Sequence, residues 1–387
     1  MQSMLLTNGL LFDIETGKTQ KKDILISEGK LKTISDRISI EDNIHKTIDL
    51  QEKYVLPGII DCHTHLGIIE EGTGKIGVDN NETSDPVTPH LRGIDGINPL
   101  DIAFKDAISS GITAVMSGPG SNNVVGGQSA AVKTFGKIID QMILKNPIGL
   151  KVSFGENPIS TYGVNSKSPV TRMGITSLIR ELFMKTQDYM VRKEKNKIKE
   201  RNMRFEAVIP LLQGKIPLRA HAHRADDIIT AIRIAEEFHI KKLIIEHGTE
   251  AHLIKDYLVE KKVPVAYGPM LTPRIKMELR QRHYSAALEL AEAGVKVALI
   301  TDHPYNSIEQ LRTIAILAKA EGLSLIDALK TITLHPAEIL ECDDRIGRIA
   351  PGFDADLAIF NGNPFDINAK NHMTIIDGRI VFTRDTK

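Results

Sequence analysis

Short apolar runs alternate with longer amphipathic stretches over most of the chain. From Val55 onward, brief β-type runs are followed by segments of helical periodicity, which is typical of βα units around a parallel sheet. The pattern predicts eight strands, at 59–65, 113–117, 130–134, 149–154, 217–223, 242–247, 264–268 and 296–301. It predicts helices at 176–200, 226–238, 251–260, 285–293 and 307–320. A closed (β/α)8 barrel of the TIM type is the simplest arrangement of these units.

Both ends of the chain show a different pattern. Residues 3–12, 23–26 and 31–34 form short β-type runs separated by turn residues, and similar runs follow at 355–360 and 373–382. Each piece alone is too short to bury a face. We therefore predict one small β-sandwich domain built from residues 1–57 and 341–387, flanking a barrel domain at 58–340.

Composition excludes several classes of protein. The 387 residues are 42% hydrophobic and 25% charged, which suits one large core with a satellite domain. The 49 basic and 49 acidic residues balance, so no basic field favours a nucleic-acid partner. No apolar run approaches the roughly 20 residues of a membrane span, and the first residues lack a leader pattern. Cys62 and Cys342 provide no disulfide framework, so we expect a cytoplasmic protein without membrane partners.

Histidines gather where the predicted strands end. His63 and His65 are two residues apart on a strand, so both side chains lie on one face, which in a barrel is the interior. His221 and His223 repeat this spacing on the fifth strand. The sixth strand ends in His247 and the eighth is followed by Asp302, both of which are ligand-type residues. Because barrel active sites lie at the carboxyl ends of the strands, this pattern indicates a divalent metal site.

Lys151 lies near the end of the fourth predicted strand. A free ammonium group there would be desolvated and would repel a cation, so it must be neutralised or paired. One interpretation is a lysine carbamate that bridges two metal ions. The other is a lysine that extends to solvent or pairs with Glu156.

These residues carry a resemblance to the amidohydrolase superfamily, and most of all to its imidazolonepropionase-like branch. The matching motifs span nearly the whole chain: residues 56–65 (LPGIIDCHTH), Lys151, 220–223 (AHAH), 245–248 (IEHG), 301–304 (TDHP) and 347–357 (GRIAPGFDADL). The resemblance implies a distorted (β/α)8 barrel that carries out metal-dependent hydrolysis. Members of this type often self-associate, so we also expect a homo-oligomer.

The resemblance also implies a ligand set. His63, His65 and Asp302 would hold a first metal, His221 and His247 a second, and carboxylated Lys151 would bridge them. The first histidine of the fifth-strand motif is the usual ligand, which leaves His223 to contact substrate or to support the site. Zinc suits these ligands, as would iron, manganese or cobalt.

The expected chemistry is hydrolysis of a C–N bond in a small-molecule amide, cyclic amide, N-acyl amino acid or dipeptide. A metal-activated hydroxide attacks the carbonyl, while Asp302 passes the proton to the leaving nitrogen. For substrate binding, the sequence offers cationic or polar side chains in predicted loops at the barrel mouth, where a carboxylate can be bound. These are His90, Arg92, Arg172, Arg224 and Arg274.

Two other functions remain open. Imidazolonepropionases proper use one metal and no lysine ligand, so a one-metal imidazolonepropionase or aromatic deaminase would leave Lys151 structural. A non-catalytic scaffold is the alternative from another class, since some members of the superfamily lose metal ligands and act through assembly. This chain retains every ligand position. The metal count separates the two enzyme hypotheses.

Overall fold

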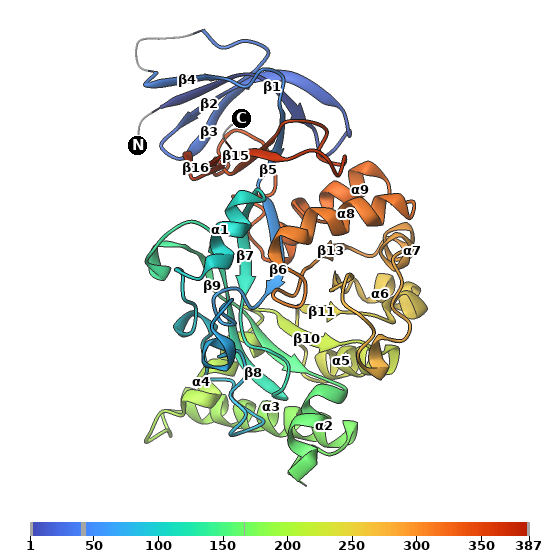
Figure 1. Cartoon of the computed structure of the whole chain (residues 1–387). Coiled ribbons are helices and arrows are strands. Elements are labelled where there is room, and N and C mark those ends of the chain that lie inside the picture. Colours follow the sequence, from blue (N-terminus) through green and yellow to red (C-terminus); the bar gives the residue numbers. More distant parts are fainter. Residues whose placement is uncertain (1–2, 40–43, 166, 385–387) are drawn as a thin grey trace.

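The computed structural model describes residues 3–39, 44–165 and 167–384. They form a barrel with a second sheet at one end, where the N-terminal and C-terminal strands lie side by side (Figure 1). Among these residues, no helix combines the length and the apolar character that crossing a bilayer requires.

The second sheet joins both ends of the chain. Its strands from the N-terminal side are β1 (Met4–Phe12), β2 (Thr19–Ser27), β3 (Lys30–Ser35), β4 (Lys46–Asp49) and β5 (Tyr54–Pro57), and those from the C-terminal side are β14 (Leu357–Phe360), β15 (Asn371–Ile376) and β16 (Arg379–Thr383). The strand order is β16-β15-β14-β5-β1-β2-β3, with β4 beside β1. The antiparallel pairing of β14 with β5 links the two ends. The strands belong to one continuous sheet, whereas the sandwich form and the domain boundaries stay predictions.

Eight strands form the barrel sheet. In spatial order they are β6 (Ile59–Thr64), β7 (Ile112–Ser117), β8 (Val125–Lys133), β9 (Ile143–Ser153), β10 (Leu218–Ala222), β11 (Leu243–His247), β12 (Val265–Tyr267) and β13 (Val297–Leu299). Every residue of β6, β10 and β11 is buried, as expected for strands covered on both faces.

The third strand of the barrel sheet, β8, departs from the regular barrel that the sequence predicts. β8 is longer than the predicted 130–134 and runs antiparallel to both β7 and β9, because short hairpin connections join these three strands in place of helices. Gly126 and Gly127 lie within this strand. Gly127 has φ +124°, and a Cβ there would lie 2.4 Å from the Leu91 carbonyl oxygen. Glycine therefore lets the 67–99 segment approach β8, where the Gln128 amide donates to Leu91.

The helices cover the outside of the barrel (Figure 1). They are α1 (Ile102–Ser109), α2 (Glu156–Tyr162), α3 (Arg172–Glu194), α4 (Met203–Leu212), α5 (Ala225–Glu237), α6 (Lys255–Lys261), α7 (Ala286–Ala293), α8 (Leu311–Ala320), α9 (Leu325–Lys330) and α10 (Leu334–Ile339). The predicted helix at 251–260 is a 3-10 turn followed by α6, and α3 spans Arg172–Glu194 where 176–200 was predicted. In α5, acidic residues occupy the first turn and an apolar stripe packs inward.

Hydrogen bonds between the β6 segment and the segment after β13 bring the two ends of the barrel sheet together and position two candidate ligands. The Asp302 amide donates to the His63 carbonyl at 3.2 Å, and the His65 amide donates to the His303 carbonyl at 2.9 Å. The buried Asp61 carboxylate accepts from the backbone amide of Thr301 at 3.0 Å. Residues 63–65 and 301–303 are thereby held next to each other.

A buried lysine joins the barrel to the second sheet. Lys133, at the end of β8, is 4% exposed at its side chain and pairs with Asp354, Asp356 and Asp377. Its ammonium nitrogen lies 3.0 Å from Asp354 Oδ2 and 3.1 Å from Asp377 Oδ1. Burial raises the pKa of Asp356 to about 6, although the attraction of Lys133 acts in the opposite direction.

Candidate metal centre

The predicted ligands meet in one buried cavity at the carboxyl ends of the barrel strands. The cavity has a volume of about 250 Å³. Six of the residues that line it were expected from the sequence to bind metal: His63, His65, Lys151, His221, His247 and Asp302. His223, expected to contact substrate, lines it as well. The site-forming side chains therefore come from β6, β9, β10 and β11, from the residues directly after β6 and β10, and from the segment after β13.

His63, His65 and Asp302 form one side of this site. The Nε2 atoms of His63 and His65 lie 3.0 and 3.4 Å from the same Asp302 oxygen. His65 Nδ1 is 2.8 Å from the Gly118 carbonyl, which can accept only from a protonated nitrogen. That contact fixes the tautomer of His65 and leaves the Nε2 lone pair facing the site, the arrangement that metal-ligating histidines adopt.

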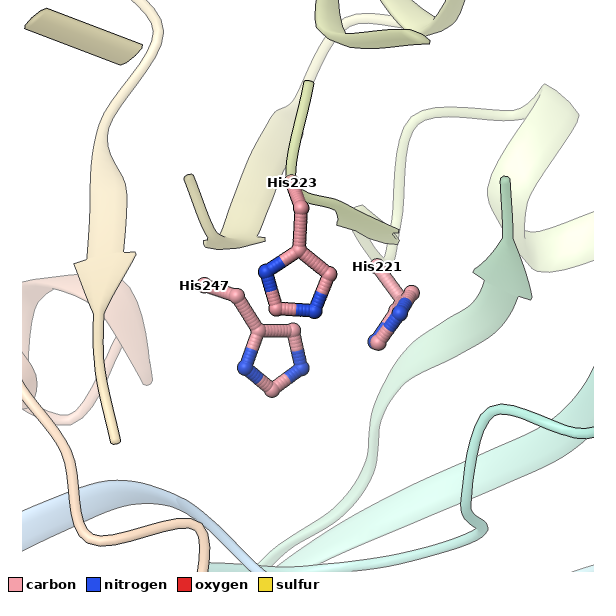
Figure 2. Close-up of side chains that lie close together, drawn as sticks. All are labelled: His221, His223 and His247. Carbon is pink, nitrogen blue, oxygen red and sulfur yellow. The ribbon is translucent and has the colours of Figure 1, made fainter. Parts of the chain in front are cut away.

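Three histidines form the other side. Figure 2 shows the rings of His221, His223 and His247 clustered together, and their nitrogens lie within 4.8 Å of one another. His247 Nδ1 donates to the Gly268 carbonyl at 2.9 Å, and His223 Nδ1 lies 2.8 Å from Thr249 Oγ1. Among the residues that the structure describes, His221 Nδ1 is buried without a hydrogen-bond partner.

The electrostatics favour neutral imidazoles in this cluster. Burial lowers the pKa of His247 to about 3. Burial and the neighbouring histidines hold the pKa values of His221 and His223 well below the usual value. A neutral imidazole is the form that binds a metal. His247 also converges with His63 and Asp302, so it connects the two sides of the site.

The neighbour of Lys151 differs from the one expected. Its ammonium group pairs with Glu246 of β11 and not with Glu156, and both partners are buried. Glu246 also lies 2.7 Å from Arg219 Nε and 3.0 Å from His63 Nδ1. Burial alone would raise the pKa of Glu246, but these three cationic neighbours hold that pKa well below its usual range. In the sequence, Glu246 stands out as a charged residue inside an otherwise apolar strand, but no role was assigned to Glu246 from the sequence.

The five side chains predicted to bind substrate lie outside the histidine cavity. Arg92 and Arg224 form exposed pairs with Asp95 and Asp226, Arg172 pairs with Asp227 and Glu278, and Arg274 donates to the Arg282 carbonyl. His90 and Arg92 line a separate cavity of about 750 Å³. The two cavities share Asn80 and Asn81 of the 67–99 segment. A substrate-binding role for the five stays a prediction.

Other polar residues, which sequence reasoning missed, line the histidine cavity. Lys276, two residues beyond Arg274, donates to Asn157 Oδ1 at 2.9 Å. Burial lowers the pKa of Lys276, although the nearby Glu278 carboxylate acts in the opposite direction. The remaining members of this group are Asn80, Asn81, Ser121, Asn122, Ser160, Thr272 and Tyr305. Most of them belong to loops, whose side-chain directions no simple periodicity reveals.

Comparisons with known proteins agree with this architecture. The model of the amidohydrolase family matches residues 239–382. A crystal structure of an amidohydrolase from Thermotoga maritima MSB8 superimposes with a TM-score of 0.95 and is 44% identical in sequence. The alignment covers 98% of this chain and 100% of that chain. This chain therefore belongs to the amidohydrolase family, which confirms the superfamily predicted from its motifs.

Two further relatives are more distant. The amidohydrolase tasK of Hapsidospora irregularis is 25% identical over 93% of this chain, which spans only 40% of the length of tasK. A prolidase solved in complex with N-methylphosphonate-L-proline is 18% identical, with a TM-score of 0.67 and coverage of 99% of this chain and 100% of that one. This last similarity shows the fold alone. The imidazolonepropionase-like branch stays a prediction.

Proposed function

We propose that this chain is a metal-dependent hydrolase that cleaves amide-type C–N bonds in small molecules such as N-acyl amino acids, dipeptides or cyclic amides. The observation that carries the proposal is the convergence of four strand-end histidines, Lys151 and Asp302 in one buried cavity. Family membership supports the hydrolase class. The fold shared with a proline-specific peptidase supports dipeptides as candidates.

The donor atoms fit a divalent metal. His65 and His247 use Nδ1 to contact backbone carbonyls and keep Nε2 for a ligand, while His221 retains a buried nitrogen without a partner among the described residues. We propose that His63, His65, His221, His247 and Asp302, together with a carboxylated Lys151, would hold two zinc ions. When bound, such ions polarise a carbonyl and lower the pKa of water.

Asp302 is the proposed proton shuttle. Burial would raise the pKa of this carboxyl, but the neighbouring histidines, His247 and His63 above all, hold that pKa well below its usual value. Asp302 is therefore a carboxylate near neutral pH, able to accept the proton of the attacking water and return it to the leaving nitrogen. His223, with one ring nitrogen next to Thr249, is proposed to orient the substrate.

The pairing of Lys151 with Glu246 favours a second candidate function. A lysine neutralised by a buried carboxylate has no need of a carbamate, and the site would then hold one metal. One-metal members act as imidazolonepropionases or aromatic deaminases. In this alternative, His63, His65, one histidine of the fifth strand and Asp302 keep their roles, and Lys151 is structural.

The deciding experiment measures metal per chain by elemental mass spectrometry, on protein produced with added zinc and bicarbonate and without chelator. About two ions per chain supports the two-metal hydrolase. About one supports the alternative. The same protein is then assayed against dipeptides, N-acyl amino acids and cyclic amides, and separately against imidazolone rings and aromatic amines. A metal-loaded protein that hydrolyses none of them contradicts both functions.

The remaining properties stay proposals. We propose a cytoplasmic homo-oligomer with a small-molecule substrate and no nucleic-acid or membrane partner. The balance of 49 basic and 49 acidic residues supports the exclusion of nucleic acid. Sedimentation of the purified protein checks the oligomeric state.

A further inference from the structure

The histidine cavity contains a cation that the proposed metal chemistry does not use. Two lysines line this cavity, Lys151 and Lys276, among the residues that the structure describes. Glu246, which is fully buried, already neutralises Lys151. Lys276 lies outside the barrel strands, in the loop between β12 and α7, and its side chain is 21% exposed. It is therefore the cation available to a molecule that enters the cavity.

Neighbouring residues hold the Lys276 ammonium in place. It donates to Asn157 Oδ1 at 2.9 Å and lies 3.4 Å from Glu278 Oε2. Glu278 is in turn bound by the Glu156 backbone amide at 2.7 Å and by Arg172 at 3.3 Å, so its charge is shared between two cations. An ammonium group has three donors, of which one is directed to Asn157 and a second faces the Glu278 carboxylate. One donor therefore remains for a ligand.

Asn157 connects this lysine to the proposed metal ligands. Its Nδ2 atom lies 3.4 Å from His221 Nε2 and donates to Ser121 Oγ at 2.7 Å. Lys276 lines the same cavity as His221 and His223. A substrate whose scissile amide lies over the histidines would thus have the ammonium group within reach.

We propose that Lys276 binds a carboxylate of the substrate, so that the site selects amides with a free carboxylate next to the scissile bond. The proposal rests on the hydrolase function proposed above and narrows its substrate class. A lysine ammonium binds an anion such as a carboxylate as a point charge and does not require bidentate geometry. Three sources share this chemistry: the C-terminus of a dipeptide, the carboxylate of an N-acyl amino acid, and a carboxylated cyclic amide.

Paired ligands test the proposal by binding, independently of turnover. N-acetyl amino acids and glycyl dipeptides are compared with the same molecules carrying a terminal carboxamide, by calorimetric titration of metal-loaded protein that carries Asp302→Asn to suppress turnover. With Lys276 in place, this protein is expected to bind the carboxylates at least about 10-fold more tightly. Lys276→Met should remove this preference, and Lys276→Arg should keep part of it. Arg280→Met is the control, because it removes a charge from the same loop outside the cavity.

The outcomes separate the two proposals. Equal affinity for carboxylate and carboxamide, no saturable binding of either, or a preference that survives Lys276→Met overturns the carboxylate role. A carboxylate preference without hydrolysis of any ligand by the wild type leaves that role standing and contradicts the hydrolase function. In hydrolysis assays, Lys276→Met should raise KM for carboxylated substrates by about 10- to 100-fold while kcat changes little. A loss of kcat that is equal for both ligand types contradicts substrate selection.

Discussion

Lys133 is the most direct place to test how the barrel is joined to the second sheet. Its buried ammonium contacts Asp354, Asp356 and Asp377, which belong to the C-terminal part of the chain. The change Lys133→Met keeps much of the side-chain volume and removes the charge. Asp356 then loses its only salt-bridge partner among the described residues.

The surroundings of the three aspartates limit the loss of stability expected for Lys133→Met. Removing one partner of a buried ion pair costs about 3–5 kcal/mol, because the other charge stays buried without compensation. Asp354 keeps Lys30 and Arg345, and Asp377 is 44% exposed and remains hydrated. Only Asp356 is left buried and unpaired, so we expect a loss of about 3 kcal/mol in the free energy of unfolding, the low end of the range.

The loss should depend on pH. The pKa of Asp356 in the folded protein is about 6, raised by burial. Without Lys133 it rises further, because the attraction that lowered it is gone. A carboxyl whose folded pKa lies above its unfolded value of about 3.9 contributes stability at low pH and loses it as pH rises through the folded pKa. For each unit by which the pKa of Asp356 rises further in Lys133→Met, the loss in the free energy of unfolding at pH 8 exceeds the loss at pH 5 by about 1.4 kcal/mol.

Urea unfolding followed by circular dichroism at pH 5 and pH 8 measures both effects. Lys30→Met is the matched control: it removes a half-exposed partner of Asp354 and should cost about 0–1 kcal/mol. The double change Lys133→Met with Asp356→Asn should recover part of the loss. A deficit for Lys133→Met below about 1 kcal/mol, equal at both pH values, would refute the reasoning.

Three further changes test the metal centre. Asp302→Asn should retain the metal while kcat falls by about 100-fold or more, and activity that survives largely intact removes the proton-shuttle role. Lys151→Ala should lose the second ion in elemental analysis, and a variant with two ions per chain excludes the bridge. Glu246→Gln should weaken metal affinity by about 10- to 100-fold in a chelator competition, because His63 loses the carboxylate beside its Nδ1; an unchanged affinity contradicts this support.

Periodicity predicted most of the fold because buried barrel strands are continuous apolar runs with distinct ends. It failed at β8, where Gly126 and Gly127 resemble a turn but lie inside a strand. Glycine is needed at 127 because the Leu91 backbone approaches β8 too closely for a Cβ. This contact is made by a segment that is distant in sequence, so the local pattern of residues cannot predict it.

The candidate site also has a part that the sequence predicts and a part that it does not. The convergence of His63 with His247 and Asp302 could be predicted, because strand periodicity and barrel closure together fix where strand ends meet. The cationic side chains that line the mouth of the barrel could not be predicted. Arg274 and Lys276 are two residues apart in one loop, yet only Lys276 lines the cavity. Loop backbone, unlike a strand, gives no rule for which of two side chains faces inward.

Charge balance links the state of Lys151 to the number of metal ions. As an ammonium it neutralises Glu246, which also pairs with Arg219. Conversion to a carbamate changes its charge from +1 to −1 and places a second anion beside Glu246. The difference of two charges in this buried site equals the charge of one divalent ion, and uncompensated buried charge is costly. A second ion and a carbamate should therefore appear together, so protein that holds one ion per chain should retain an unmodified Lys151 in its intact mass.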